Sequence, residues 1–103
     1  MTGMRLLFER SGGLLGRKIS LTVDLEELPS DQSQILRDLL DKSDFFNLPN
    51  SFSPAARPDE FQYKVSVESG DRRHTVETGE TSLPAPLRPL ISELSLRART
   101  RRA

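Results

Sequence analysis

Few side chains in this sequence could carry out bond-breaking chemistry. The chain of 103 residues contains one histidine, His74, and no cysteine, so a nucleophile with its paired base cannot be assembled from the usual residues. It also lacks a glycine-rich phosphate loop and a histidine–cysteine cluster at metal-ligand spacing. The acidic residues are scattered, so the sequence does not exclude a catalytic pair of carboxylates but does not favour one. We therefore predict a binding protein that is not an enzyme and needs no cofactor.

Two other features could contact a partner. Residues 11–16 read Ser-Gly-Gly-Leu-Leu-Gly, so the glycines Gly12 and Gly13 favour a mobile loop that presents Leu14 and Leu15 at its tip. These leucines either fold back onto the domain or bind a partner, and the sequence favours neither. The end of the chain is rich in arginine, with Arg97, Arg99, Arg101 and Arg102. A phosphate-binding tail is conceivable, but we favour a solvated, flexible tail over about 97–103, because arginines near a helix end complement its dipole.

The element that best positions such residues is a predicted β-hairpin over residues 61–78. Gly70 and Asp71 suit a type II′ turn, with glycine at the first central position. The register then places Glu68 opposite Arg73, Lys64 opposite Glu77 and Ser66 opposite Thr75. The other face carries Phe61, Tyr63, Val65, Val67, His74 and Val76. His74 is therefore expected to be a structural histidine on the inward face and not a general base.

A second hairpin is predicted near the N-terminus, where apolar residues alternate in two segments. The register we expect places Phe8 opposite Ile19, Leu6 opposite Leu21, Met4 opposite Val23 and Glu9 opposite Lys18. Residues 11–16 would then form the connecting loop.

Two helices complete the pattern. Ser30 is the expected N-cap of a helix that ends near Ser43, and a second helix begins around 84–86, with Pro89 in its first turn. Each helix has an apolar stripe that we expect to be core: Ile35, Leu36, Leu39 and Leu40 in the first, Leu87, Leu90, Ile91 and Leu94 in the second.

These elements predict one small α+β domain over residues 1–103. Its order is ββαββα, with two β-hairpins in a four-stranded antiparallel sheet packed by two helices. The 15 basic and 15 acidic residues balance, so no net field steers the chain to nucleic acid or to a membrane. The absence of cysteine and of an apolar N-terminal run leads us to expect a cytoplasmic protein, and we expect a monomer.

The chain path brings three loops together. The loop of residues 11–16, the helix exit segment of residues 44–60 and the connection 79–86 should lie at one end of the sheet, with the Gly70–Asp71 turn at the other. That end is a candidate binding surface built on a rigid scaffold.

Several motifs, in this order and spacing, resemble the emfourin family. They are Phe8-Glu9-Arg10-Ser11-Gly12-Gly13, Thr22-Val23-Asp24, Phe45-Phe46-Asn47-Leu48-Pro49, Asp59-Glu60-Phe61-Gln62-Tyr63, Arg73-His74-Thr75-Val76 and Leu87-Arg88-Pro89-Leu90. The resemblance runs from Met4 to about Arg97; residues 50–58 and the arginine-rich end depart from it. Emfourin-like proteins are small bacterial inhibitors of protealysin-like peptidases, which are zinc enzymes of the thermolysin family.

The resemblance implies an inhibitor of a thermolysin-like peptidase, with no small-molecule substrate and no metal of its own. Such a target offers a zinc ion with an open coordination position beside an apolar pocket. Asp59 is then the proposed ligand to the target's zinc, with Glu60, Asp44 and the terminal carboxylate as weaker candidates, and Leu14 and Leu15 would fill the pocket. Without the resemblance, Asp59 is an ordinary turn carboxylate after Pro58.

Two alternative functions stay open at this point. An interaction subunit could bind a partner strand at the open sheet edge, and a nucleic-acid-binding accessory protein could use the arginine-rich end.

Overall fold

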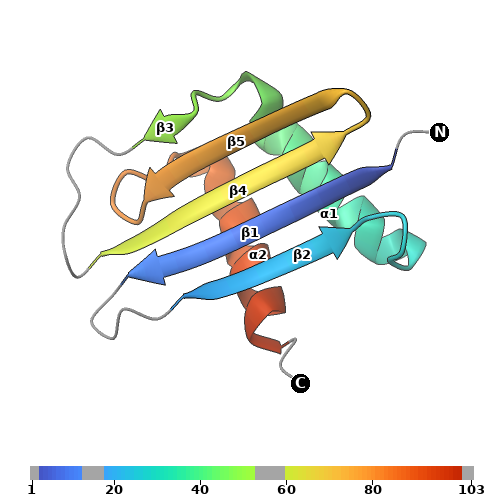
Figure 1. The fold of residues 1–103 in the computed structure, drawn as a ribbon, viewed down its shortest axis with the longest axis horizontal. Coiled ribbons are helices and arrows are strands. Elements are labelled where there is room, and N and C mark those ends of the chain that lie inside the picture. Colours follow the sequence, from blue (N-terminus) through green and yellow to red (C-terminus); the bar gives the residue numbers. More distant parts are fainter. Residues whose placement is uncertain (1–2, 13–17, 53–59, 101–103) are drawn as a thin grey trace.

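The computed structural model describes residues 3–12, 18–52 and 60–100, and these form a sheet with two helices packed against one of its faces (Figure 1). The elements are β1 (Met4–Gly12), β2 (Ile19–Asp24), α1 (Ser30–Ser43), the short 3₁₀ helix η1 (Phe45–Asn47), β3 (Ser51–Phe52), β4 (Phe61–Ser69), β5 (Arg72–Gly79), the 3₁₀ helix η2 (Ala85–Leu87) and α2 (Arg88–Thr100). The predicted α+β class and ββαββα order are confirmed.

The sheet has the strand order β2-β1-β4-β5-β3, and its four long strands are antiparallel. The fifth strand, β3, was not predicted. It lies parallel to β5, with Ser51 beside Glu77 and Phe52 beside Thr78, and the Glu77 amide donates to the Asn50 carbonyl at 2.8 Å. A strand of two residues has no alternating pattern in the sequence, so only its pairing with β5 reveals it.

The β4–β5 hairpin has the predicted register. Lys64 pairs with Glu77 and Glu68 with Arg73, the Ser66 and Thr75 hydroxyls lie 2.8 Å apart, and Arg73 approaches Glu68 at 3.5 Å. Gly70 has φ +60°, whereas Asp71 is not among the residues with positive φ. This combination is that of the type II′ turn, so glycine at the first central position fixes the register.

The predicted register of the first hairpin is wrong by two residues. Phe8 lies opposite Leu21 and Leu6 opposite Val23, and the Leu25 amide donates to the Met4 carbonyl at 2.9 Å. A shift of two keeps every side chain on its expected face, because side chains alternate with period two. It also brings Leu25 into the core at 1% exposure. Lys18 still reaches Glu9, at 3.6 Å, so this ion pair did not distinguish the two registers.

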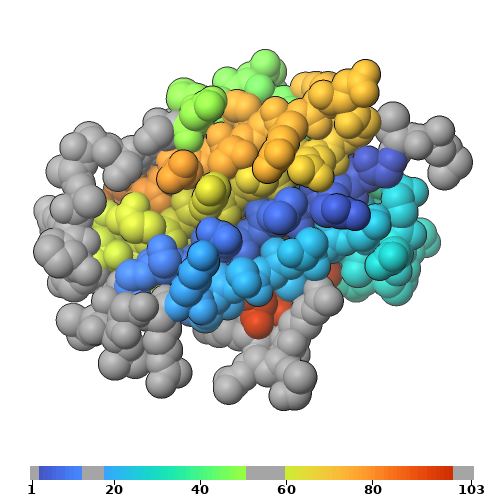
Figure 2. Space-filling view, in the orientation of Figure 1, coloured from blue at the N-terminus to red at the C-terminus, as the bar shows by residue number. Residues whose placement is uncertain are grey.

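The core lies between the sheet and the helices. It consists of Leu6, Phe8, Leu21, Val23, Leu25, Leu36, Leu40, Phe45, Val65, Val67, Val76, Leu87, Leu90, Ile91 and Leu94. The α2 stripe is buried as predicted. Figure 2 shows the sheet face that the helices leave uncovered, where residues of all four long strands are seen. An antiparallel sheet can leave one face to water when its outward residues are mainly polar, as they are in β4 and β5.

Two expectations for α1 are wrong. Ile35 was expected in the core but is 41% exposed, while Leu36 and Leu40 of the same stripe are buried. The stripe is narrower than predicted, because α1 meets the rest of the domain along one line of residues. Ser30 was expected to be the N-cap, but Pro29 holds that position and no side chain caps the helix. The fixed φ of proline already prepares the chain for the first turn.

His74 is structural, as predicted. Its Nε2 lies 2.7 Å from the Leu48 carbonyl oxygen, and its ring packs edge-on against Phe45 with centroids 5.4 Å apart. These contacts attach the segment after α1 to the middle of β5.

A flexible C-terminal tail was expected to begin at about Arg97, and this expectation is wrong. Arg97 lies within α2, and its guanidinium donates to Glu93 and to Gln32, each at 2.7 Å. The second bond joins α2 to α1, so Arg97 belongs to the folded domain.

Neither helix in the described residues is long and apolar enough to cross a membrane.

We predict that Leu94→Ala lowers the free energy of unfolding by about 2–5 kcal/mol, because the Leu94 side chain is fully buried and its loss leaves a cavity. Leu96→Ala is the matched control on the same helix. Leu96 is 49% exposed, so the change should stay within about 0.5 kcal/mol. Chemical denaturation of the three proteins measures both values, and equal losses in the two variants would contradict the assignment of the core.

Candidate functional site

Three parts of the chain meet at one end of the sheet: the end of β1, the start of β4 and the connection that follows β5 (Figure 1). We call these parts the three rim segments. Gly12, the last residue of β1, pairs with Phe61, and Gly79, the last residue of β5, pairs with Gln62. The amide of Glu80 donates to the Phe61 carbonyl at 2.9 Å. We call this end the rim and define it by its described residues: Gly12, Glu60, Phe61 and residues 79–82.

The side chain of Glu60 is the central contact of the rim. Glu60 is only 7% exposed. Its Oε1 accepts hydrogen bonds from the Thr81 amide, at 3.0 Å, and from the Thr81 hydroxyl. Its other oxygen accepts from the Gln62 amide group at 3.4 Å. A buried carboxylate is costly unless it is hydrogen-bonded, and these donors meet that requirement. The carboxylate of Glu60 is therefore used inside the protein.

Two glycines make this approach possible. A Cβ at Gly12 would lie 2.6 Å from the carbonyl oxygen of Glu60, and the φ of +92° at Gly12 is itself unfavourable for other residues. A Cβ at Gly79 would lie 2.5 Å from Oε2 of Glu60. Both distances are shorter than a Cβ tolerates. At Gly12 the obstacle is backbone, so β1 approaches Glu60 this closely because the position lacks a side chain, whereas at Gly79 the Glu60 carboxylate would have to shift.

The helix side of the rim carries a cluster of aromatic and charged groups. The guanidinium of Arg10 lies 4.7 Å from the ring centroid of Phe61, and Tyr63 stacks on Phe8 with centroids 6.2 Å apart. Burial raises the pKa of the Tyr63 hydroxyl, and the nearby Glu80 carboxylate adds to this, while Arg10 opposes it. Partly exposed tyrosine, phenylalanine and arginine, such as Tyr63, Phe61 and Arg10 here, are enriched in protein–protein interfaces.

Of the six site residues predicted from the sequence, Gly12 and Glu60 lie in the rim. The other four, Gly13, Leu14, Leu15 and Asp59, lie outside the described residues. Gly12 directly precedes residues 13–17 and Glu60 directly follows residues 53–59, and the two are in contact. The described ends of these two segments are thus neighbours, and the connection that follows β5 reaches the same point through the bond from Thr81 to Glu60.

Asp44 does not belong to this end of the molecule. It ends α1 with φ +54° and its Oδ1 accepts from the Asn47 side chain at 2.8 Å. It lines a depression together with Met4 and Arg72, which stand at the start of β1 and of β5, far along the sheet from the rim. The expectation that the whole segment 44–60 lies at the rim is therefore wrong for its first residues. The chain leaves α1 at the opposite end of the sheet, and β3 then runs parallel to β5, toward the rim.

Sequence reasoning missed Thr81 and Glu80. Thr81 binds a carboxylate 21 residues away in the sequence, and Glu80 places an exposed carboxyl group at the rim. The only local signal is Ser82, whose hydroxyl accepts from the Gly79 amide at 3.0 Å, as in an ordinary turn. A turn sequence of this kind does not indicate a distant partner.

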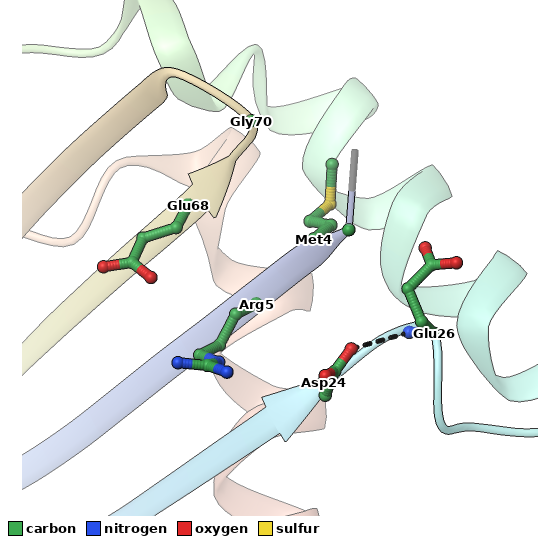
Figure 3. Close-up of a pocket in the computed structure, with 7 residues that line it drawn as sticks. Met4, Arg5, Asp24, Glu26, Glu68 and Gly70 are labelled. Atoms are coloured by element: carbon green, nitrogen blue, oxygen red, sulfur yellow. Dashed lines mark hydrogen bonds between the residues drawn. The ribbon is translucent and has the colours of Figure 1, made fainter. Parts of the chain in front are cut away.

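A separate depression of about 380 Å³ lies at the opposite end of the sheet (Figure 3). Arg5 stands between Asp24 on β2 and Glu68 on β4, its partners in the strand register. Asp24 is also engaged locally, since its Oδ1 accepts from the Glu26 amide at 3.0 Å. Within residues 3–12, 18–52 and 60–100, no group of acidic or histidine side chains is arranged to hold a metal ion.

The comparisons with known proteins give one match. No curated protein and no solved structure matches the chain. A family model described as Emfourin matches residues 8–95, a span that runs from the middle of β1 through most of α2 and contains the whole rim. Since the match covers well over half of the chain, the resemblance noted in the sequence is confirmed and the chain belongs to the Emfourin family.

Proposed function

We propose that this protein inhibits thermolysin-like zinc metallopeptidases by presenting the segments that are attached at the rim to the active-site cleft. The observation that carries the proposal is the family match over residues 8–95. Emfourin is a family of metallopeptidase inhibitors, and membership supports a general inhibitory role and a peptidase partner. The thermolysin-like target and the mode of blocking are our proposal.

The geometry of the rim supports insertion at this end. An inhibitor binds tightly when its contact segments are held in the bound shape before the target arrives. Here the described ends of three segments are attached side by side to the main sheet, through the contact of Gly12 with Glu60 and the bonds from Glu60 to Thr81. The arrangement is that of loops on a rigid scaffold.

We assign the carboxylate that binds the target's zinc to Asp59. Sequence reasoning proposed Asp59 first and Glu60 second, and the buried, hydrogen-bonded state of Glu60 weighs against its leaving the rim to bind a metal. A carboxylate can occupy the open fourth position of a catalytic zinc and displace the reactive water. Leu14 and Leu15 would fill the apolar pocket beside the zinc, the role that the family resemblance suggests for them.

The proposal includes no reaction at the inhibitor itself. The one histidine contacts the Leu48 carbonyl and the aromatic rings around it, and Glu60 accepts from Thr81, which weighs against either side chain serving as a base. A cytoplasmic location is part of the same proposal, and fractionation of the producing cells tests it.

A partner-binding role at the sheet edge is the second candidate. The observation in its favour is that β2 is an edge strand of the sheet, with a depression lined by Val23, Leu28 and Arg97 beside it. Edge strands can accept a strand from another protein. Loss of partner binding on Thr22→Pro, with peptidase inhibition absent, would favour this candidate.

We predict that the purified protein abolishes cleavage of a short peptide by a thermolysin-like peptidase at a near-equimolar ratio. The inhibitor should remain uncut, because the proposed contact segments are attached to a folded domain. Residual activity and mass spectrometry of the mixture measure the two effects. Full activity at a large molar excess of the protein would refute the proposed function.

We predict that Asp59→Ala weakens inhibition by about 2–5 kcal/mol, since it removes a charged ligand in a site that excludes water. Asp71→Ala is the control, because Asp71 is an exposed acid in the turn at the opposite end of the sheet. Inhibition constants and melting temperatures of both variants decide the matter. If Asp71→Ala weakened inhibition and Asp59→Ala did not, the assignment of the contact end would be wrong.

We predict that Leu14→Ala and Leu15→Ala weaken inhibition. The expected loss is about 1–3 kcal/mol for each of the two leucines that becomes buried in the complex. Leu96→Ala, an exposed leucine on α2, controls for the loss of surface leucine as such. Unchanged inhibition constants in both loop variants would remove the leucines from the contact surface.

A further inference from the structure

We infer that Glu60 and Thr81 form a clamp that holds the rim in the shape that the target recognises, so that both are positioning residues. The inference rests on the proposed function and deepens it. It replaces the earlier expectation that Glu60 touches the target with a role inside the inhibitor.

The first argument is where the clamp is placed. Glu60 is the first described residue after segment 53–59, and Thr81 lies in the connection between β5 and η2. Both the amide and the hydroxyl of Thr81 donate to one carboxylate oxygen. Hydrogen bonds to a charged acceptor are the stronger ones in proteins. The clamp therefore fastens the start of β4 to the segment that follows β5.

The second argument is that the chain has glycine at the two positions where a side chain would crowd Glu60. The absent Cβ at Gly79 is what makes room for Oε2 of Glu60, and the absent Cβ at Gly12 is what lets β1 approach the Glu60 carbonyl. Two strands thus close on the same residue, one against its carboxylate and one against its backbone. The ends of all three rim segments are fixed relative to one another through Glu60.

The third argument is that the clamp is separate from the core. Thr81 is exposed, and its partner lies at the end of the sheet, outside the layer of apolar side chains between sheet and helices. Opening the clamp should loosen the rim without unfolding the domain, as local openings do at the edge of a stable structure.

The clamp has a kinetic consequence that a merely structural contact lacks. If it is opened, the rim samples several shapes and the target can bind only the fraction that is competent. The association rate constant falls with that fraction, whereas the dissociation rate constant is unchanged, because the contacts in the final complex are the same. A residue that touches the target would instead alter dissociation.

The test compares Thr81→Val with Thr81→Ser, since valine keeps the shape of threonine without its hydroxyl and serine keeps the hydroxyl. Association and dissociation rate constants for a thermolysin-like peptidase are measured by surface plasmon resonance, alongside the melting temperature. We expect Thr81→Val to associate about tenfold more slowly with unchanged dissociation and melting temperature, and Thr81→Ser to behave as wild type.

Gly79→Ala opens the clamp by a second route, because its Cβ would displace the Glu60 carboxylate without removing a polar group. We expect the same slowing. Amide hydrogen exchange adds a readout that needs no peptidase: the Thr81 amide should exchange faster in Gly79→Ala, while the amides of Leu7 and Ser66 in the β1–β4 ladder keep their protection.

The outcomes separate the two claims. A wild-type protein that inhibits, with variants that associate at the wild-type rate, overturns the clamp and leaves the proposed function standing. A change confined to dissociation also overturns it, because Thr81 would then be a target contact. A wild-type protein that does not inhibit overturns the proposed function and, with it, the role of the clamp in inhibition.

Discussion

The pairing of β1 with β4 is the constraint on which the rest of the structure depends. It joins the two hairpins, which are separated in the chain by α1 and β3, and runs from Met4 beside Ser69 to Gly12 beside Phe61. Leu6 and Phe8 meet Val67 and Val65 along this ladder, and all four are almost completely buried. The ladder continues as far as Gly12 and Phe61. The segment that follows Gly12 and the segment that precedes Glu60 are therefore attached at adjacent points of the rim.

This constraint divides the domain into an apolar core and a polar rim. A sheet covered by helices on one face has limited core, so most stability comes from the apolar layer beneath β1 and β4. The rim lies beyond that layer and is held by polar contacts around Glu60. The core and the rim are therefore held by different kinds of contact, apolar burial in the first and hydrogen bonds to a carboxylate in the second.

The remaining contacts anchor the helices and the segment after α1. His74 binds Leu48 and packs on Phe45, and Arg97 bonds to Gln32 across the two helices. A lone histidine and an arginine-rich end are features that commonly indicate function in a sequence. In this protein both His74 and Arg97 are used to hold elements together, since each polar group is satisfied within the fold.

The sequence by itself determined the class, the order of the elements and the β4–β5 register, because Gly70–Asp71 permits one kind of tight turn and a slip of one residue would expose a whole apolar face. It left the register of the first hairpin ambiguous, since registers that differ by two residues keep every side chain on the same face and no short turn selects between them. Only the tertiary structure placed Leu25 in the core, left Ile35 exposed and turned Glu60 inward. The bonds from Glu60 to Thr81 depend on the packing of β1, β4 and β5 at one end of the sheet. A contact between residues so far apart in the chain leaves no local pattern, so the sequence identified Glu60 as a site residue but the fold decided what its carboxylate does.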